Sequence, residues 1–159
     1  MTVPRVLAFD LGTHMAACWN YHTKPPLMVE VASWTLQGYN RPEKLAYLGT
    51  HVLVLMKNMW VGGWRPDVVF YERPFARGFH ATRMLWGIAG ILEAWAAREE
   101  LPVVDMPPGT IKAWATGKGG AKKEAMIEAA ASMGYPGADE HEADAWCARA
   151  YAAANVEWE

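Results

Sequence analysis

The chain has 159 residues, 52% of them hydrophobic and 20% charged, a composition typical of a globular protein and not of a disordered one. A chain of this length buries roughly 70% of the surface that its unfolded form exposes, so it needs no disulfides to fold. Its two cysteines, Cys18 and Cys147, form no CxxC pattern, which predicts buried free thiols in a reducing compartment. We expect residues 1–159 to form one domain.

The N-terminus lacks the apolar run of a secretion signal, and charges interrupt every apolar stretch before the ~18 residues needed to span a bilayer. We therefore expect a cytoplasmic protein with no membrane partner. The net charge of −2 argues against a nucleic-acid partner when taken alone. Residues 73–123, however, carry eight Lys or Arg against four acids, whereas residues 124–159 carry eight acids against Arg149 alone. This asymmetry is compatible with one basic face, and an ordinary solvated surface is the alternative.

Apolar patterning and turn residues predict an ordered series of strands and helices. Asn40, Pro42 and Glu43 form a helix start, with an N-cap, a proline in the first turn and a capping-box acid. Gly62-Gly63 ends that helix. The predicted strands are residues 5–11, 15–21, 28–36, 67–71 and 101–106, and the other predicted helices are residues 79–98, 110–115, 121–133 and 139–154.

This order predicts an α/β fold with a mixed five-stranded sheet and helices on both faces. The first three strands are joined by short turns, which favours an antiparallel meander. Right-handed strand–helix–strand crossovers then place the last two strands parallel to the first.

Two carboxylates stand where a buried sheet would not normally tolerate them. Asp10 ends the apolar strand 5–11, and Glu72 directly follows the strand 67–71. A carboxylate in such a place must reach solvent, a cation or hydrogen-bond donors. Ligands bind at the carboxyl ends of parallel strands, so both acids are expected at one edge of the sheet. The alternative for each acid alone is a local cap of a turn.

A third acidic cluster begins the last predicted helix, where the helix dipole alone would favour acids. His141 and Asp144 are three residues apart and share a face of that helix, while Glu142 points about a quarter-turn away and is expected to be solvated. Carboxylates with one imidazole suit Mg²⁺ or Mn²⁺ better than structural Zn²⁺. The predicted ligands of a two-cation site are Asp10, Glu72, His141 and Asp144.

Three segments together resemble the RuvC family of Holliday-junction resolvases. Phe9-Asp10-Leu11-Gly12-Thr13 is similar to the first acidic motif of that family, Tyr71-Glu72-Arg73-Pro74-Phe75 to the second, and His141-Glu142-Ala143-Asp144-Ala145 to its last helix. The resemblance covers about residues 5–154. It implies a ribonuclease H-like fold, a homodimer, and an endodeoxyribonuclease of recombination and repair that cuts four-way DNA junctions with Mg²⁺ or Mn²⁺. The compact chain suits a phage-encoded member.

The resemblance also implies DNA contacts. Phe75 resembles the aromatic residue that the family inserts at the junction centre, and Lys112 and Lys123 resemble its DNA-contacting lysines. Aromatic and basic side chains beside an acidic site, and lysines flanking glycines, are suited to stacking on bases and holding phosphates. An ordinary surface loop is the alternative reading. The predicted DNA-binding residues are Arg73, Phe75, Arg77, Lys112, Lys118, Lys122 and Lys123.

Three other functions compete with a junction-cutting nuclease. The Phe9–Thr13 segment also resembles the phosphate-binding hairpin of actin-like phosphotransferases, but the chain has no second such segment and is too short for that fold. A non-catalytic DNA-binding module would not need to keep the acids together. Cleavage of flaps, forks or RNA–DNA hybrids stays open, because the metal ligands do not determine the substrate. With His141 among the ligands, we expect activity to be higher with Mn²⁺ than with Mg²⁺.

Overall fold

The computed structural model describes residues 3–21, 28–75 and 78–156. Its order is β1 (Val6–Asp10), β2 (His14–Asn20), β3 (Val29–Thr35), α1 (Arg41–Tyr47), a π-helical turn (Leu48–Val52), α2 (Leu53–Asn58), a 3-10 turn (Met59–Gly62), β4 (Val68–Glu72), α3 (Phe79–Arg98), β5 (Val103–Met106), α4 (Thr110–Thr116), α5 (Lys123–Ser132) and α6 (Glu140–Asn155).

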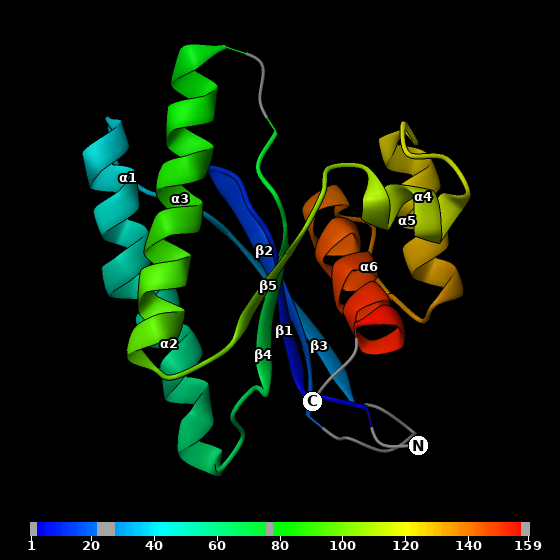
Figure 1. Ribbon diagram of the computed structural model, residues 1–159, viewed down its shortest axis with the longest axis horizontal. Helices are drawn as coiled ribbons and strands as arrows, with labels where there is room; N and C mark the ends of the chain where they lie inside the picture. The colour runs from blue at the N-terminus through cyan, green and yellow to red at the C-terminus, as the bar shows by residue number, and fades with distance from the viewer. Residues whose placement is uncertain (1–2, 22–27, 76–77, 157–159) are drawn as a thin grey trace.

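The sheet has the strand order β3-β2-β1-β4-β5, with β1, β2 and β3 antiparallel and β4 and β5 parallel to β1. Helices α1, α2 and α3 cover one face, and α4, α5 and α6 cover the other (Figure 1). The predicted mixed five-stranded sheet with helices on both faces is confirmed. The parallel pairing of β1 and β4 brings the ends of these two strands, Asp10 and Glu72, to the same edge.

Successive side chains of the central strands point to opposite faces of the sheet and pack into two separate cores. Leu7 and Phe9 of β1 point into the core under α1–α3, while Val6 and Ala8 point into the core under α4–α6. All four side chains are buried. A strand that is buried on both faces reads as a continuous apolar run, which is why its final aspartate stands out in the sequence.

The helix that starts after Asn40 has the predicted cap and an unpredicted interruption. The Asn40 Oδ1 accepts a hydrogen bond from the Glu43 amide at 3.0 Å, as an N-cap should. Eight residues after Asn40 the helix widens into the π-helical turn at Leu48–Val52, and α2 continues from there. Apolar spacing does not distinguish such a turn from a regular helix, so the sequence predicted one uninterrupted helix.

Among the residues that the structure describes, no helix is both long and apolar enough to cross a membrane.

Candidate active site

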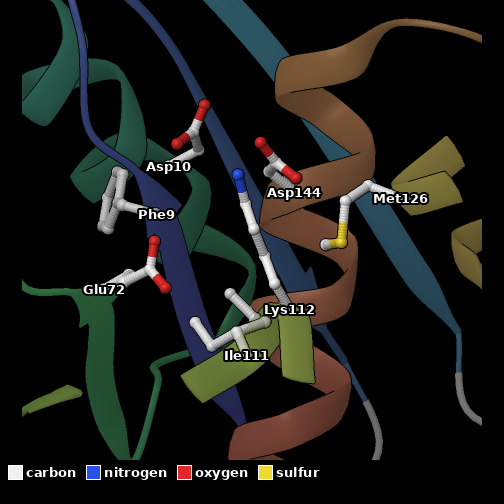
Figure 2. Close-up of a pocket in the computed structure, with 8 residues that line it drawn as sticks. Phe9, Asp10, Glu72, Ile111, Lys112, Met126 and Asp144 are labelled. Atoms are coloured by element: carbon white, nitrogen blue, oxygen red, sulfur yellow. The ribbon is translucent and has the colours of Figure 1, made fainter. Parts of the chain in front are cut away.

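Three carboxylates from distant parts of the chain line one cavity of about 140 Å³. Asp10 comes from the end of β1, Glu72 from the end of β4, and Asp144 from the second turn of α6. Figure 2 shows their carboxylates directed toward a common space beside Phe9 and Met126. The expected convergence of the three acids is therefore present in the fold.

Small residues on α6 allow Asp144 to lie close to the ends of β1 and β4. Ala145 and Ala148 are buried against the sheet side of the molecule and pack with Val6 and Ala8 of β1. Side chains this short let the helix lie close to the strands, and α6 contacts both β1 and β2. Asp139 begins the helix as its N-cap and accepts hydrogen bonds from the amides of His141 and Glu142, each at 2.9 Å.

Burial and mutual repulsion disturb the ionisation of two of the acids. Burial raises the pKa of Asp144 to about 7, and the charge of Asp10 adds to that effect. The Oδ1 atom of Asp144 is buried and has no hydrogen-bond partner among the described residues. Burial also raises the pKa of Glu72, against the opposing effect of the Gly109 amide, which donates to Glu72 Oε1 at 2.8 Å. These are the effects expected of carboxylates crowded in a space that excludes water.

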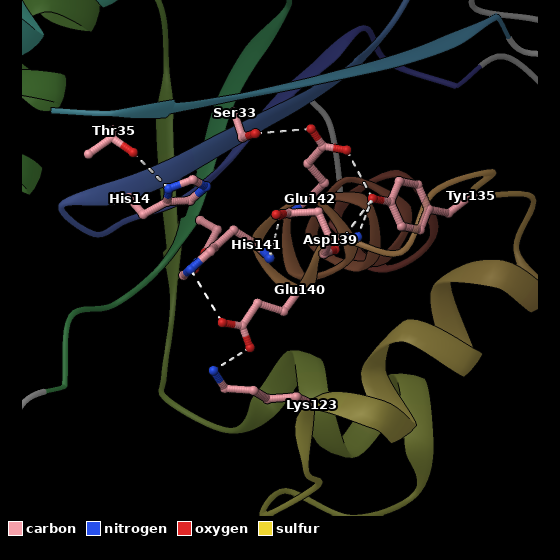
Figure 3. A network of polar contacts seen from close by, with 10 residues as sticks. His14, Ser33, Thr35, Lys123, Tyr135, Asp139, Glu140, His141 and Glu142 are labelled. Carbon is pink, nitrogen blue, oxygen red and sulfur yellow. Dashed lines mark hydrogen bonds and ion pairs between the residues drawn. The ribbon is translucent and has the colours of Figure 1, made fainter.

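His141 is not among the residues that line this cavity, but it contacts Asp10 directly. Its Nδ1 is 2.8 Å from Asp10 Oδ2, and its Nε2 is 3.6 Å from Glu140 Oε1. The hydrogen bond to Asp10 raises the pKa of His141. The ring of His14 packs against the imidazole with 4.6 Å between ring centroids, and His14 Nδ1 is in turn 3.0 Å from Thr35 Oγ1 (Figure 3). The imidazole is thus oriented from both sides.

Lys112 holds a position that the sequence did not predict. It comes from α4 and lines the acidic cavity, with its amine directed between the carboxylates of Asp10 and Asp144 (Figure 2). Its charge lowers the pKa of both Glu72 and Asp144, partly offsetting the effect of burial. Lys112 therefore supplies positive charge inside the site and not on a surrounding surface.

Within residues 3–21, 28–75 and 78–156, no three His, Cys, Asp or Glu side chains form a ready-made metal-binding group. The donors are nevertheless of the right kind, because carboxylate oxygens with one imidazole suit Mg²⁺ or Mn²⁺. The unpartnered Asp144 Oδ1 is an acceptor that a divalent cation would satisfy. The residues present fit a divalent cation, provided that the Lys112 amine moves aside.

Glu142 is not the solvated residue that its place on the helix suggested. Its two carboxylate oxygens accept hydrogen bonds from Ser33 at 3.0 Å and from the Tyr135 hydroxyl at 2.9 Å (Figure 3). It therefore joins α6 to β3 and to the turn after α5. The expectation was wrong because helical spacing shows which way a side chain points but not which neighbouring element it meets.

The predicted DNA-binding residues lie around the cavity in different environments. Phe75 is 71% exposed and lines an adjoining cavity of about 410 Å³ that also reaches Asp10 and Glu72. Gly109 and Gly119 line the same cavity and lie against each other; Gly109 has a φ of +81°, and an added Cβ there would be 3.3 Å from the Gly119 carbonyl oxygen. This contact closes the glycine-rich loop over α4.

The predicted basic residues differ in whether they form an ion pair within the part of the chain that the structure describes. Lys118 and Lys122 are exposed and line an open cavity of about 500 Å³ beside the glycine loop. Lys123 forms an ion pair with Glu140 at the start of α6, and Arg73 pairs with Asp105 at 2.5 Å. Arg77 lies outside the described residues.

The sheet order and the helices on its two faces form a ribonuclease H-like fold. No family model matches the chain. In sequence, 94 residues (58% of the chain) are 30% identical to the crossover junction endodeoxyribonuclease RuvC of Prochlorococcus marinus, covering 61% of that protein. A stretch of 93 residues is 39% identical to RuvC of Corynebacterium diphtheriae, covering 56% of either chain. These alignments thus span less than two thirds of each relative.

Solved structures extend the likeness over nearly the whole chain. The RuvC structure of Thermus thermophilus superposes with a TM-score of 0.70 at 22% identity, covering 92% of both chains. The T. thermophilus RuvC structure in complex with a Holliday junction substrate has a TM-score of 0.71 at 22% identity, covering 94% of this chain and 93% of the other. The predicted resemblance to RuvC is confirmed, and the fold is that of RuvC.

Proposed function

We propose that this protein is a divalent-metal-dependent endonuclease that cuts branched DNA, with four-way junctions as its preferred substrate. The convergence of Asp10, Glu72 and Asp144 in one cavity carries this proposal. Sequence similarity to RuvC proteins and the likeness to a RuvC structure holding a Holliday junction support it. We further propose that residues 1–159 act as one nuclease domain in the cytoplasm of a bacterial or phage-infected cell, where such DNA is found.

The proposed metal ligands are Asp10, Glu72, His141 and Asp144. Two bound Mg²⁺ or Mn²⁺ ions would supply an activated water and charge stabilisation of the leaving 3′-oxygen in an in-line displacement. The protein's own groups prepare the site for this chemistry. The Gly109 amide orients the Glu72 carboxylate, and His14 and Asp10 together orient the His141 ring. Lys112 is placed to neutralise a non-bridging oxygen of the scissile phosphate once its amine leaves the carboxylates.

The proposed DNA contacts surround this centre. Phe75 stands exposed at the cavity next to Asp10 and Glu72, where stacking on an unpaired base is worth about 1–3 kcal/mol. Bases at a branch point lose stacking on one side and unpair more readily than those inside a continuous duplex, so such a contact would favour branched DNA. The proposed phosphate contacts are Arg73, Arg77, Lys112, Lys118, Lys122 and Lys123.

Cutting two opposed strands requires two sites, so we propose a homodimer. Helix α3 offers a surface for it: Phe79 and Trp86 are 67% and 48% exposed, and an added Cβ at Gly90 would meet nothing within 4 Å. Gly87 plays a different part, because Leu45 of α1 fills the space beside it, with 3.0 Å between Leu45 Cδ1 and an added Cβ. Gly87 thus serves packing within the chain, and Gly90 leaves room for a second helix.

The test is cleavage of end-labelled four-way, forked, flapped and linear DNA, and of an RNA–DNA hybrid, with Mg²⁺ or Mn²⁺, mapping the cuts on every strand. We expect paired cuts on opposed strands of the four-way junction and no cutting in EDTA. Faster cutting of forks, flaps or hybrids would show that the protein is a nuclease whose preferred substrate is not the four-way junction. Tight junction binding without cutting in either metal would leave a DNA-binding module and overturn the proposal.

A further inference from the structure

A further polar cavity lies at the opposite end of β3 from the acidic site. It has a volume of about 350 Å³ and is lined by Val29, Met133, Gly134, Trp146 and Arg149. Val29 begins β3, whereas Thr35, which supports His14 beside the active site, ends it. On α6, Arg149 follows Asp144 by five residues and so points about 140° around the helix from it. The cavity is therefore separate from the proposed catalytic centre.

Arg149 is a buried cation without a counter-charge in the part of the chain that the structure describes. Only 6% of its surface is exposed, and its Nε is buried without a hydrogen-bond partner there. The guanidinium lies over the Trp146 ring, 5.8 Å from the ring centroid. No described carboxylate is within ion-pair distance of it. A buried charge without a counter-ion is strongly unfavourable, so a bound anion would stabilise this arginine.

The neighbours of Arg149 do not supply that anion. Burial raises the pKa of the Cys18 thiol to about 12, against the opposing effects of the Arg149 charge and of a hydrogen bond with Arg149, so the thiol is a neutral partner at pH 7. Glu142 lies two turns earlier on the same face of α6 and keeps its charge, but its carboxylate oxygens accept hydrogen bonds from Ser33 and Tyr135 and form no ion pair with Arg149 among the described residues. Neither group therefore forms an ion pair with Arg149, which lines the cavity.

We propose that this cavity binds a carboxylate group through Arg149. The other polar groups on its wall are already used: the Trp146 Nε1 donates to the Met133 carbonyl at 3.3 Å, and the Gly134 amide donates to the Ala131 carbonyl at 3.0 Å. The remaining wall is the apolar surface of Val29, Met133 and the Trp146 ring. One planar guanidinium satisfies the two oxygens of a carboxylate side by side, but it would leave further oxygens of a phosphate unpaired.

The test follows the Trp146 indole N–H in ¹H–¹⁵N spectra of the full chain during titration with sodium acetate at constant ionic strength. Trp146→Phe identifies its resonance among the nine tryptophans. We expect a saturable shift with a millimolar Kd, and a thermal midpoint about 3–6 °C higher at ten times Kd. Arg149→Met should weaken acetate binding at least about tenfold, and Arg149→Lys should also weaken acetate binding. Arg98→Met, at an exposed arginine, should bind acetate as the wild type does.

Sodium phosphate and a second variant complete the experiment. Phosphate that shifts the resonance at lower concentration than acetate would overturn the proposal, as would equal acetate shifts in Arg149→Met and Arg98→Met. The wild-type comparison of acetate with phosphate decides the question even if Arg149→Met does not fold. The carboxylate could come from this chain or from another molecule. Tighter acetate binding to Glu157→Gln/Glu159→Gln would identify the chain's own acids as competitors, and equal binding would identify an external source.

Discussion

His141 Nδ1 and Asp10 Oδ2 lie 2.8 Å apart although 131 positions separate the two residues in the chain. This contact joins the start of α6 to the end of β1 and places an imidazole beside the carboxylates that are proposed to hold the cations. A nitrogen donor in that position favours Mn²⁺ over Mg²⁺, because Mg²⁺ prefers oxygen ligands.

We therefore expect wild-type cleavage to be faster with Mn²⁺ than with Mg²⁺, and His141→Asp to shift that preference toward Mg²⁺. The ratio of the initial rates in the two metals should fall by about 10–100-fold, the effect typical of altering a metal's surroundings. His51→Asp changes an exposed histidine that stacks on Tyr47 away from the cavity, and it should leave the ratio unchanged. An unchanged ratio in His141→Asp would exclude His141 as a ligand.

Asp10 and Glu72 end neighbouring parallel strands and reach the same cavity. Asp10→Asn or Glu72→Gln removes a charged ligand with little change of shape. Each should lower the single-turnover cleavage rate at least about 100-fold while junction affinity in Ca²⁺ stays within a few-fold. Asp67→Asn, at the opposite end of β4, removes an exposed partner of Arg5 and should leave cleavage unaffected. Near wild-type cutting by both site variants would disprove the assignment.

Asp144 should destabilise the metal-free protein at neutral pH. Its pKa is about 7 in the folded state, against an ordinary value of 3.8. Between these two values the folded state holds a proton that the unfolded state has lost, so the contribution of Asp144 to the free energy of unfolding falls as the pH rises from about 4 to about 7. Above pH 7 the loss of free energy of unfolding caused by Asp144 has reached its full size.

Asp144→Asn should therefore raise the free energy of unfolding at pH 8 in EDTA by about 2–4 kcal/mol, and this gain should disappear near pH 4. Urea denaturation at the two pH values measures it. Glu128→Gln, an exposed acid on α5, should change stability by less than about 0.5 kcal/mol at either pH. A stability gain in Asp144→Asn that is equal at pH 4 and pH 8 would show that the carboxylate is not strained by burial.

Local patterns in the sequence predicted the sheet and the positions of its acids because buried strands and helix caps have short-range signatures. Val6–Asp10 is a run of buried residues that ends in a carboxylate, and Asn40 and Asp139 cap helices through their own side chains. Strand connectivity then placed Asp10 and Glu72 at one edge of the sheet.

The contacts between side chains of different elements were not predictable in this way. Nothing in the sequence near Lys112 indicates that its amine points between two carboxylates and not toward solvent, because that depends on how α4 sits against α6. His14 supports His141 from β2, and Glu142 joins α6 to β3, both through pairings that only the folded chain creates. The only local hint for His14 was its place four residues after Asp10.

Phe75 follows β4 three residues after Glu72 and leaves most of its ring exposed beside the acidic cavity. An exposed phenylalanine contributes little to the fold, so Phe75→Ala should change the free energy of unfolding by less than about 0.5 kcal/mol. Loss of base stacking at the cut should lower the cleavage rate by about 10–100-fold, while the phosphate contacts keep junction affinity within about threefold. Single-turnover cleavage and gel-shift titration on one four-way junction measure the two effects. Met28→Ala, at an exposed apolar side chain before β3 and at the far end of that strand from Thr35, is the control and should cut at the wild-type rate. Equal losses of cleavage and binding in Phe75→Ala would mean that this ring contributes general affinity and does not position the strand for cutting.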